Sequence, residues 1–294
     1  MTDEAGFAIV DKPQGITSHG VVAAMRRLLG TRKVGHGGTL DPMATGLLVV
    51  AVNKGTKLLT YVSGLDKTYD ATIRLGEATS TDDAEGETVA VKPAGDVSEA
   101  AVREALAAQT GEIDQVPSSV SAVKIDGKRA YQRVRDGEEV VIKPRRVRIS
   151  AIDVHAVRRE GEFTDVDVTV ACSSGTYIRS IARDAGEALG VGGHLTALRR
   201  TSIGPFRLDR AKTLGELEEA GRADLLPMGS SASLLMPSFT VSADEVRRLV
   251  MGQKIRARGE GGVYALVDDS GDLVAVGRDK GERVKTEIVV ARQV

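Results

Sequence analysis

Apolar and polar residues alternate along two segments of the chain in the way that half-buried β-strands do. In residues 68–75, Tyr69 opens a row of apolar side chains on one face, and polar side chains occupy the other. Residues 166–172 repeat this alternation and end at Cys172. A third segment, residues 47–52, is apolar throughout and predicts a strand that is buried on both faces. We therefore expect a partly buried sheet.

Helices are predicted where apolar residues recur every three or four positions between a capping residue and a glycine. Residues 18–30 fit this pattern, with Ser18 as the N-cap and Gly30 after the last turn. Residues 98–111 and 178–190 fit it as well. Strands and helices follow one another without a steady strand–helix–strand rhythm, which favours the α+β class over a doubly wound sheet.

Glycine, proline and polar residues predict where the chain leaves these elements. Residues 35–46 contain four Gly and one Pro, residues 79–96 are polar and acidic, and residues 222–241 contain two Pro and a Ser-rich run. We interpret the first two as loops and the third as a linker. A capping box at residues 242–245 then opens a helix, and short strands follow. The last ~55 residues thus predict a small, mainly-β domain.

Composition places the protein among folded, water-soluble chains. It has 294 residues, of which 41% are hydrophobic and 28% are charged, enough to build a sizeable core. The single cysteine, Cys172, excludes an intramolecular disulfide and a cysteine-based metal cluster. The N-terminus lacks the pattern of a secretory signal, and no apolar stretch approaches the ~18 residues of a membrane span. A cytoplasmic protein is predicted.

Charge is distributed unevenly, although the formal net charge is only −1. Residues 124–148 carry nine Lys and Arg against four Asp and Glu. Such a basic surface fits a phosphate backbone, although a solvated basic hairpin is the commoner explanation of a charge run. The candidate RNA-binding residues in this segment are Lys124, Lys128, Arg129, Arg145, Arg146 and Arg148.

Several common chemistries lack their sequence motifs. The Gly-rich residues 35–40 are not followed by the Gly-Lys-Ser/Thr of a nucleotide-binding loop, and the chain has no G-x-S-x-G motif. The four histidines are scattered, with no pair at metal-ligand spacing. An enzymatic activity would therefore rest on a carboxylate.

Four segments carry a more specific signal. They are VDKPQGITS (residues 10–18), GHGGTLDPMATGL (35–47), KTYDATIRLGEATSTDDAEG (67–86) and CSSGTYIRSI (172–181). In this order, and with PSSVSAVKIDGKRAY (117–131) in the middle, they resemble the signature motifs of the TruB family of pseudouridine synthases. The resemblance covers about residues 9–210.

The resemblance implies a fold and an activity. TruB-family enzymes isomerise uridine to pseudouridine, typically at position 55 of the tRNA T loop, without a metal or an organic cofactor. The implied fold is the pseudouridine synthase fold, with a mixed, mainly antiparallel central sheet. The implied partner is the T arm of tRNA, whose target base would be flipped out of the folded RNA. Assistance to tRNA folding is a further implication. We expect a monomer without an obligate protein partner.

The expected domains follow from the same resemblance. Residues 1–235 would form the catalytic domain, with a basic hairpin inserted near residues 117–148. Residues 240–294 lie where many relatives carry an RNA-binding PUA domain, and their position and β content predict a PUA-like domain. Cations cluster near its start: Arg247, Arg248, Lys254, Arg256 and Arg258. At residue 37 the chain has Gly where the family often has Thr.

Three residues are expected to be catalytic. Asp41 resembles the family's catalytic aspartate, Arg179 the arginine that pairs with it, and Tyr69 the tyrosine that packs on the target base. A carboxylate can attack a sugar, add to a base or move a proton, and the sequence leaves these alternatives open. A guanidinium within a few Å would keep that carboxylate ionised and oriented. For an Asp-Pro pair alone, a simple turn would be the usual explanation.

Five further residues are expected to bind the substrate. Lys12 resembles the lysine of the first motif, and His36 the histidine that stacks among T-loop nucleotides. Leu198 resembles a residue that lines the uracil pocket, and Asp83 the acidic position of the second motif. Tyr177, beside Arg179, completes the set. A structural ion pair is an equally good explanation of Lys12.

Two other kinds of protein remain as alternatives. A non-catalytic RNA-binding protein could share the fold, but it could also have lost Asp41, Tyr69 and Arg179. A small-molecule enzyme with a phosphate loop fits less well, because the nucleotide motifs are missing and residues 124–148 are basic. A gel shift with RNA would distinguish the small-molecule enzyme from the two RNA-binding proteins. Product analysis of the bound RNA would distinguish the pseudouridine synthase from the non-catalytic protein.

Overall fold

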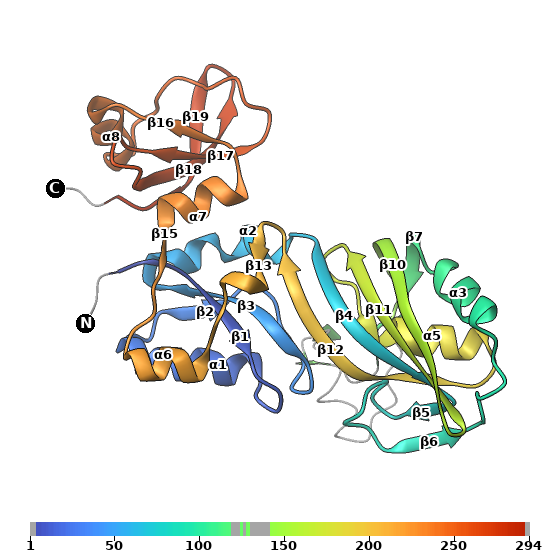
Figure 1. The fold of residues 1–294 in the computed structure, drawn as a ribbon. Coiled ribbons are helices and arrows are strands. Elements are labelled where there is room, and N and C mark those ends of the chain that lie inside the picture. Colours follow the sequence, from blue (N-terminus) through green and yellow to red (C-terminus); the bar gives the residue numbers. More distant parts are fainter. Residues whose placement is uncertain (1–3, 119–123, 126–127, 130–141, 292–294) are drawn as a thin grey trace. The chain divides into compact units, whose positions relative to one another are not determined.

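The computed structural model describes residues 4–118, 124–125, 128–129 and 142–291 (Figure 1). The chain divides into two compact units. The first unit comprises Met1–Leu40, Leu47–Ser63 and Pro205–Val294. The second unit comprises Asp41–Gly46 and Gly64–Gly204, and it contains the three residues expected to be catalytic.

The second unit is built on a sheet whose strands come from distant parts of the sequence. Its antiparallel strands are, in spatial order, β12 (Gly193–Ile203), β4 (Lys67–Leu75), β11 (Phe163–Cys172), β10 (Arg145–Glu160) and β7 (Gly111–Gln115). The first two residues of β3 (Thr45–Val52) pair with β12 in parallel. The sheet is therefore mixed and mainly antiparallel, which confirms the predicted fold class.

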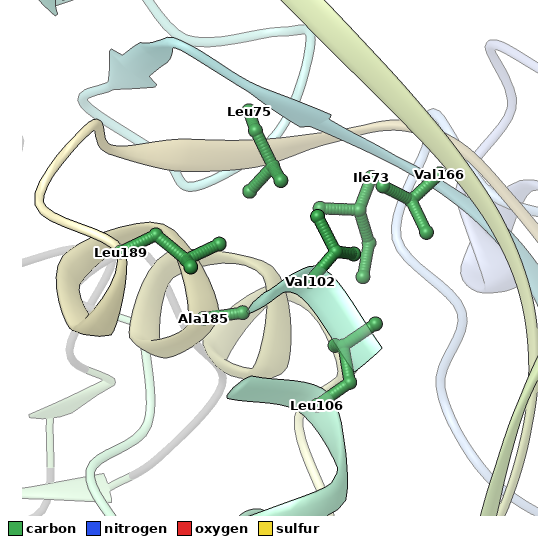
Figure 2. Close-up of a pocket in the computed structure, with 7 residues that line it drawn as sticks. All are labelled: Ile73, Leu75, Val102, Leu106, Val166, Ala185 and Leu189. Atoms are coloured by element: carbon green, nitrogen blue, oxygen red, sulfur yellow. The ribbon is translucent and has the colours of Figure 1, made fainter. Parts of the chain in front are cut away.

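The predicted alternation in β4 and β11 is confirmed. Tyr69, Ala71, Ile73 and Leu75 are all buried on one face of β4. On that face the sheet packs against α3 (Glu99–Ala107) and α5 (Ile178–Ala188), and the side chains between them leave no room for a water molecule (Figure 2). The side chains in Figure 2 are those of Ile73, Leu75, Val102, Leu106, Val166, Ala185 and Leu189. Truncating one of these larger side chains to Ala would cost roughly 2–5 kcal/mol.

Local structure departs from the sequence prediction at two places in the second unit. Residues 79–96 are not one long loop, because β5 (Glu77–Thr79) and β6 (Thr88–Val91) pair as a hairpin within them. Ser98 caps α3 as predicted, but the helix ends at Ala107, and Gly111 begins β7 instead of closing the helix. The residues between β5 and β6 form a shorter loop, which carries Asp82 and Asp83, and residues 92–98 form a second one that leads into α3.

The first unit contains the N-terminal elements. They are β1 (Gly6–Lys12), α1 (Ser18–Leu29), β2 (Val34–His36), most of β3, the 3-10 helix η1 (Asn53–Leu58) and α2 (Leu59–Ser63). The N-cap of α1 is Thr17, whose hydroxyl accepts a hydrogen bond from the Gly20 N–H, and not Ser18 as predicted. The Ser18 hydroxyl instead bonds both backbone groups of Leu40.

Residues 205–235 of the first unit form a succession of short helices and strands. These are β13 (Phe206–Arg207), the 3-10 helix η2 (Leu208–Arg210), β14 (Lys212–Thr213), α6 (Leu214–Ala220), β15 (Leu226–Pro227) and α7 (Met228–Leu235). Residues 222–241 are therefore not a linker, and Met228, Ser231 and Ala232 of α7 are buried. The capping box at Thr213 and Glu216 is present as predicted.

The C-terminal residues form the small, mainly-β element group that the sequence predicted. The strands β16 (Ser238–Thr240), β17 (Val263–Val267), β18 (Leu273–Lys280) and β19 (Arg283–Val289) pair in that order. The capped helix α8 (Ala243–Val250) packs against them through Leu249. Within the same unit, the Tyr61 hydroxyl donates to Glu287 at 2.9 Å, and Lys54 and Lys57 donate to backbone oxygens at the end of the chain. No helix of the described residues is both long and apolar enough to cross a membrane.

Candidate active site

Arg179 is the centre of a polar cluster inside the second unit. It lies in the first turn of α5, directly after the turn at Gly175, whose φ of 89° suits glycine. Its side chain is only 5% exposed. One nitrogen lies 3.1 Å from an Asp41 oxygen, and another lies 3.3 Å from an Asp83 oxygen. The structure thus brings together three residues that the sequence places up to 138 positions apart.

The two aspartates that contact Arg179 have different surroundings. The Asp41 side chain is 38% exposed. The Asp83 side chain is 3% exposed, and its Oδ1 accepts hydrogen bonds from the Thr81 hydroxyl and the Glu85 N–H. Asp41 is thus the more accessible of the two carboxylates, whereas Asp83 is buried beside Arg179, and the substrate contact expected of Asp83 stays a prediction.

Backbone groups complete the fixing of Arg179. Its Nη1 donates to the Thr81 carbonyl at 2.8 Å, and the Ser118 hydroxyl donates to the same carbonyl at 3.1 Å. The buried Gln115 holds the start of α5 from the other side. Its side-chain amide donates to the Tyr177 carbonyl at 3.0 Å and accepts from the Tyr177 N–H at 2.8 Å. Arg179 is therefore held at both its tip and its base.

Tyr69 lies on β4 next to a buried arginine of β12. Tyr69 is 7% exposed, Arg200 is 1% exposed, and the two residues are paired across the strands. Burial raises the pKa of the Tyr69 hydroxyl, while the charge and hydrogen bond of Arg200 act in the opposite direction. Leu198, two residues before Arg200, is also buried and pairs with Ala71. The expected uracil-pocket residues thus lie on neighbouring strands of one sheet.

A lysine and a cysteine lie beside this pair. Lys67 and Cys172 are opposite each other on β4 and β11, and both are buried. Burial, followed by the charge of Arg200, lowers the pKa of Lys67 to about 8. Burial raises the pKa of the Cys172 thiol to about 11, so it is not a reactive thiolate at neutral pH. The inner face of β4 therefore carries one titratable cation close to Tyr69.

Other expected substrate-binding residues have structural contacts of their own. Lys12, in the first unit, is fully buried, and its ammonium donates to the carbonyls of Pro13 and Ile16. His36, also in the first unit, packs edge-to-face on His19 with ring centroids 5.4 Å apart. Tyr177 is the N-cap residue of α5 and is half-buried. These contacts explain how the residues are held, and their substrate contacts stay predictions.

The expected RNA-binding arginines lie on β10, in the part that pairs with β7. Arg146 forms ion pairs with Glu112 and Asp114, and Arg148 pairs with Asp66 at 2.9 Å. Arg145 is exposed. Lys124, Lys128 and Arg129 belong to the short strands β8 (Lys124–Ile125) and β9 (Lys128–Arg129), and their side chains lie outside the described residues. Part of the basic charge is thus neutralised locally.

Sequence reasoning missed four residues of this cluster. Arg200 could have been found, because it follows Leu198 by two and a strand places such residues on the same face. Thr81 and Ser118 act through a backbone carbonyl and a hydroxyl, which leave no distinctive sequence pattern. Arg183 lies one helical turn beyond Arg179, and its ion pair with Asp82 required the loop conformation to be known. Among the residues that the structure describes, no group of three or more His, Cys, Asp or Glu could hold a metal ion.

Family models match most of the chain. The model described as "TruB family pseudouridylate synthase (N terminal domain)" matches residues 26–178. The model described as "tRNA pseudouridylate synthase B C-terminal domain" matches residues 179–228, and "tRNA Pseudouridine synthase II, C terminal" matches residues 236–291.

Curated relatives match over nearly their full length. The chain is 57% identical to "tRNA pseudouridine synthase B" of Arthrobacter sp. (strain FB24), covering 98% of this chain and 97% of the relative. It is 54% identical to the protein of the same name in Corynebacterium aurimucosum, covering 99% of both. Among solved structures, a chain of "a Cbf5-Nop10-Gar1 Complex" is 29% identical with a TM-score of 0.74, over 98% of this chain and 85% of the other. The family models and the curated relatives thus point to the same family as the sequence motifs.

Proposed function

The chain belongs to the TruB family of pseudouridine synthases and isomerises uridine to pseudouridine in tRNA, and we propose that its target is the uridine at position 55 of the T loop. The motifs around Asp41, Tyr69 and Arg179 support this choice, because they match the family in order and spacing. The target base lies inside a folded RNA, so the reaction requires that it be flipped into the site. A tRNA substrate is also our reason to expect the protein in the cytoplasm.

Asp41 is the carboxylate on which the reaction depends in our proposal. The reaction breaks the bond between C1′ and N1 and forms a bond between C1′ and C5. C5 then loses its proton to solvent and N1 takes up a proton, so that the product is an isomer of the substrate. The single observation that carries the proposal is the pair of environments at Arg179. Asp41 keeps one oxygen on the guanidinium and is 38% exposed, whereas Asp83 is almost wholly buried. Two carboxylates beside one cation can differ in role when their environments differ.

Arg179 and Tyr69 prepare the site for that step. Arg179 orients Asp41, because its guanidinium nitrogen lies 3.1 Å from an Asp41 carboxylate oxygen. Tyr69 presents an aromatic ring whose hydroxyl is bonded to Arg200, which leaves the ring face for stacking on uracil. Leu198 adds apolar surface on the next strand. Lys12, His36 and Tyr177 are further proposed contacts with the RNA.

We assign the C-terminal residues 240–294 a supporting role in tRNA binding, and residues 1–235 the chemistry. Three cations lie in one row across the C-terminal sheet. Lys280 is paired with Arg283 in the β18–β19 hairpin, and Arg283 is opposite Arg256 in an isolated antiparallel bridge. The backbone bonds on either side of this bridge join Ala257 to Glu282 and Val284 to Ile255. Arg256 and Arg283 thus form a non-hydrogen-bonded pair, the arrangement in which side chains are closest.

Like charges directly opposite each other destabilise a sheet unless an anion balances them. Among the described residues, none of Arg256, Lys280 and Arg283 has an ion pair with an acid. Arg256 and Arg283 border an open hollow of about 490 Å³, which Glu282 also lines. By contrast, Arg247 and Arg258 of the predicted cation cluster are paired with Asp244 and Glu245. The row of Arg256, Lys280 and Arg283 therefore fits RNA phosphates best.

The decisive experiment compares Asp41→Asn with the wild type. The change is nearly isosteric but removes the charge, so we expect turnover to be abolished while RNA affinity stays nearly intact. Tritium release from tRNA that carries 5-tritiated uridine measures turnover, and mapping of the product tests position 55. Asp66→Asn is the matched control, because Asp66 also pairs with an arginine but is exposed. Appreciable product from Asp41→Asn would contradict the role of Asp41.

A further inference from the structure

A second arginine–aspartate pair lies one helical turn from Arg179. Arg183 is four residues further along α5, so both side chains project from one face of the helix. Its Nη1 lies 3.3 Å from an Asp82 oxygen, and its Nη2 donates to the Val116 carbonyl at 2.8 Å. Its Nε donates to Asp184 at 2.9 Å. Arg183 and Asp82 are mostly buried, with side chains 21% and 14% exposed.

Asp82 lies between the two residues that hold the tip of Arg179. On one side Thr81 offers its carbonyl to Arg179, and on the other Asp83 offers its carboxylate. The Asp82 backbone has a φ of 59°, a left-handed conformation that non-glycine residues seldom adopt. Its carbonyl accepts a hydrogen bond from the Leu195 N–H. Arg183 is the cation bonded to the side chain at this tight point of the loop.

The strand exit at residues 115–118 joins the same network. The Val116 carbonyl accepts hydrogen bonds from both the Ser180 hydroxyl and Arg183. The Ser118 hydroxyl reaches the Thr81 carbonyl. Three backbone segments therefore meet at Arg183: the loop of Asp82, the exit of β7 and the first turns of α5. A shift of one of these segments would move the partners of Arg179.

We propose that Arg183 is a positioning residue for the isomerisation, acting through Asp82 to keep Thr81 and Asp83 in place around Arg179. It does not touch the reacting atoms. The inference rests on the proposed roles of Asp41 and Arg179. A misplacement of about 1 Å at a reacting group can cost roughly 100-fold in rate, even when the change is distant from the chemistry. Loss of Arg183 would also leave the buried Asp82 without its cation.

The test uses Arg183→Gln, Asp82→Asn and the double variant of the full-length protein. We expect each single change to lower kcat by roughly 10- to 100-fold while KM for tRNA changes little. The double variant should be no worse than the poorer single variant, because both changes act on one contact. Arg183→Lys should recover part of the rate. Arg103→Gln is the control, since it removes an exposed arginine that is paired with Glu99 on α3.

The pH profile of kcat separates positioning from a general loss of stability. Burial raises the pKa of Asp82, whereas the Ser118 hydrogen bond and the charges of Arg183 and Arg179 lower it, and Asp184 raises it. Without Arg183, the pKa of Asp82 should rise further. As the pH is lowered, Arg183→Gln should therefore lose activity at a higher pH than the wild type does. Asp82→Asn should lack this displacement, because Asn does not titrate.

The outcomes distinguish this inference from the proposed function. A wild type that forms no pseudouridine would overturn the proposed function itself. A wild-type kcat in folded Arg183→Gln or Asp82→Asn would overturn only the positioning role. If Arg183→Gln does not fold, as judged by thermal unfolding, Asp82→Asn alone decides, because it keeps the size and shape of the side chain.

Discussion

Lys67 shows how the fold sets the chemistry of a single residue. It is 8% exposed on the inner face of β4, and its ammonium donates to the Leu65 carbonyl at 2.7 Å. Burial and, after it, the charge of Arg200 lower the pKa of Lys67, so the protonated form is disfavoured. The alignment of Lys67, Tyr69 and Arg200 makes the expected uracil pocket sensitive to the charge on one lysine.

We predict that protonation of Lys67 makes stability depend on pH. The pKa of Lys67 is about 8 in the folded protein and 10.5 otherwise, so between these values the unfolded chain binds more protons. Stability must then rise with pH across this window. Urea unfolding at about pH 7, 9 and 10.5 should show this rise for the wild type, by ~3 kcal/mol at most, and a smaller rise for Lys67→Met. Parallel pH curves for the two proteins would contradict the prediction.

At the level of residues, the sequence predicted the side chains that we propose to carry the chemistry, but not those that hold them in place. Asp41, Tyr69 and Arg179 stand within motifs, and the structure places Asp41 and Arg179 in contact. Arg200 was missed, although strand alternation alone places it on the same face of β12 as Leu198. The contributions of Thr81 and Val116 could not be predicted, because every residue has a carbonyl and only the folded backbone determines where it points. The burial of Asp83 could not be predicted either, and its expected substrate contact stays a prediction.

Among elements, long periodic segments were predicted well and short ones poorly. The strands β4 and β11 and the helix α5 carry clear periodicity and were predicted close to their observed bounds. The elements β15, α7 and β16 were taken for a linker, because residues 222–241 contain two Pro and a Ser-rich run. Contacts formed after folding, such as the burial of Ser231 and its bond to the Leu226 carbonyl, stabilise these elements. Tertiary packing thus outweighed local preference.

Two sets of basic residues allow a direct comparison of RNA contacts. We predict that replacing Arg256, Lys280 and Arg283 with Gln makes the slope of log affinity against log salt concentration shallower by about 2. Each phosphate contact contributes roughly 0.7 to this slope, and three contacts would be lost. Replacing Arg145, Arg146 and Arg148 with Gln should flatten it less, because Arg146 and Arg148 already have acidic partners. Filter binding of tRNA over a range of salt concentrations measures both slopes.

Each set has its own contradicting result. If the slope is unchanged after the first triple substitution, the row on the C-terminal sheet does not meet phosphates. If it is unchanged after the second, the β10 arginines belong to a solvated hairpin. Arg247→Gln serves as a control for both, since that arginine is exposed but paired with Asp244 on α8.

For the molecule as a whole, the C-terminal strands share the first unit with the N-terminal elements. Their bonds with Tyr61, Lys54 and Lys57 lie within that unit, and Gly229 of α7 packs so closely on Gly271 that a side chain would not fit there. Asp41, Tyr69 and Arg179 all belong to the second unit. Removal of the C-terminal residues is therefore expected to disturb the first unit more than the second.

We predict that deletion of residues 240–294 raises KM for tRNA more than it lowers kcat. The catalytic cluster stays intact, whereas the row of Arg256, Lys280 and Arg283 is lost. The melting temperature should fall, because buried residues of α7 such as Met228 and Ala232 lose their cover. Steady-state kinetics and thermal unfolding of the truncated protein measure these effects. A collapse of kcat at saturating tRNA would mean that the deleted residues help to assemble the site.

The wide sequence separation within the cluster also determines when the enzyme can begin to work. Arg179 is synthesised 138 residues after Asp41, and β12, which carries Arg200 and pairs with β4, follows it. At roughly 5–20 residues per second, the ribosome needs roughly 7–28 s to span that interval. During this time the nascent chain displays its first motifs without their partners. The unfinished protein therefore has no means of modifying the tRNAs that are delivered to the ribosome that is making it.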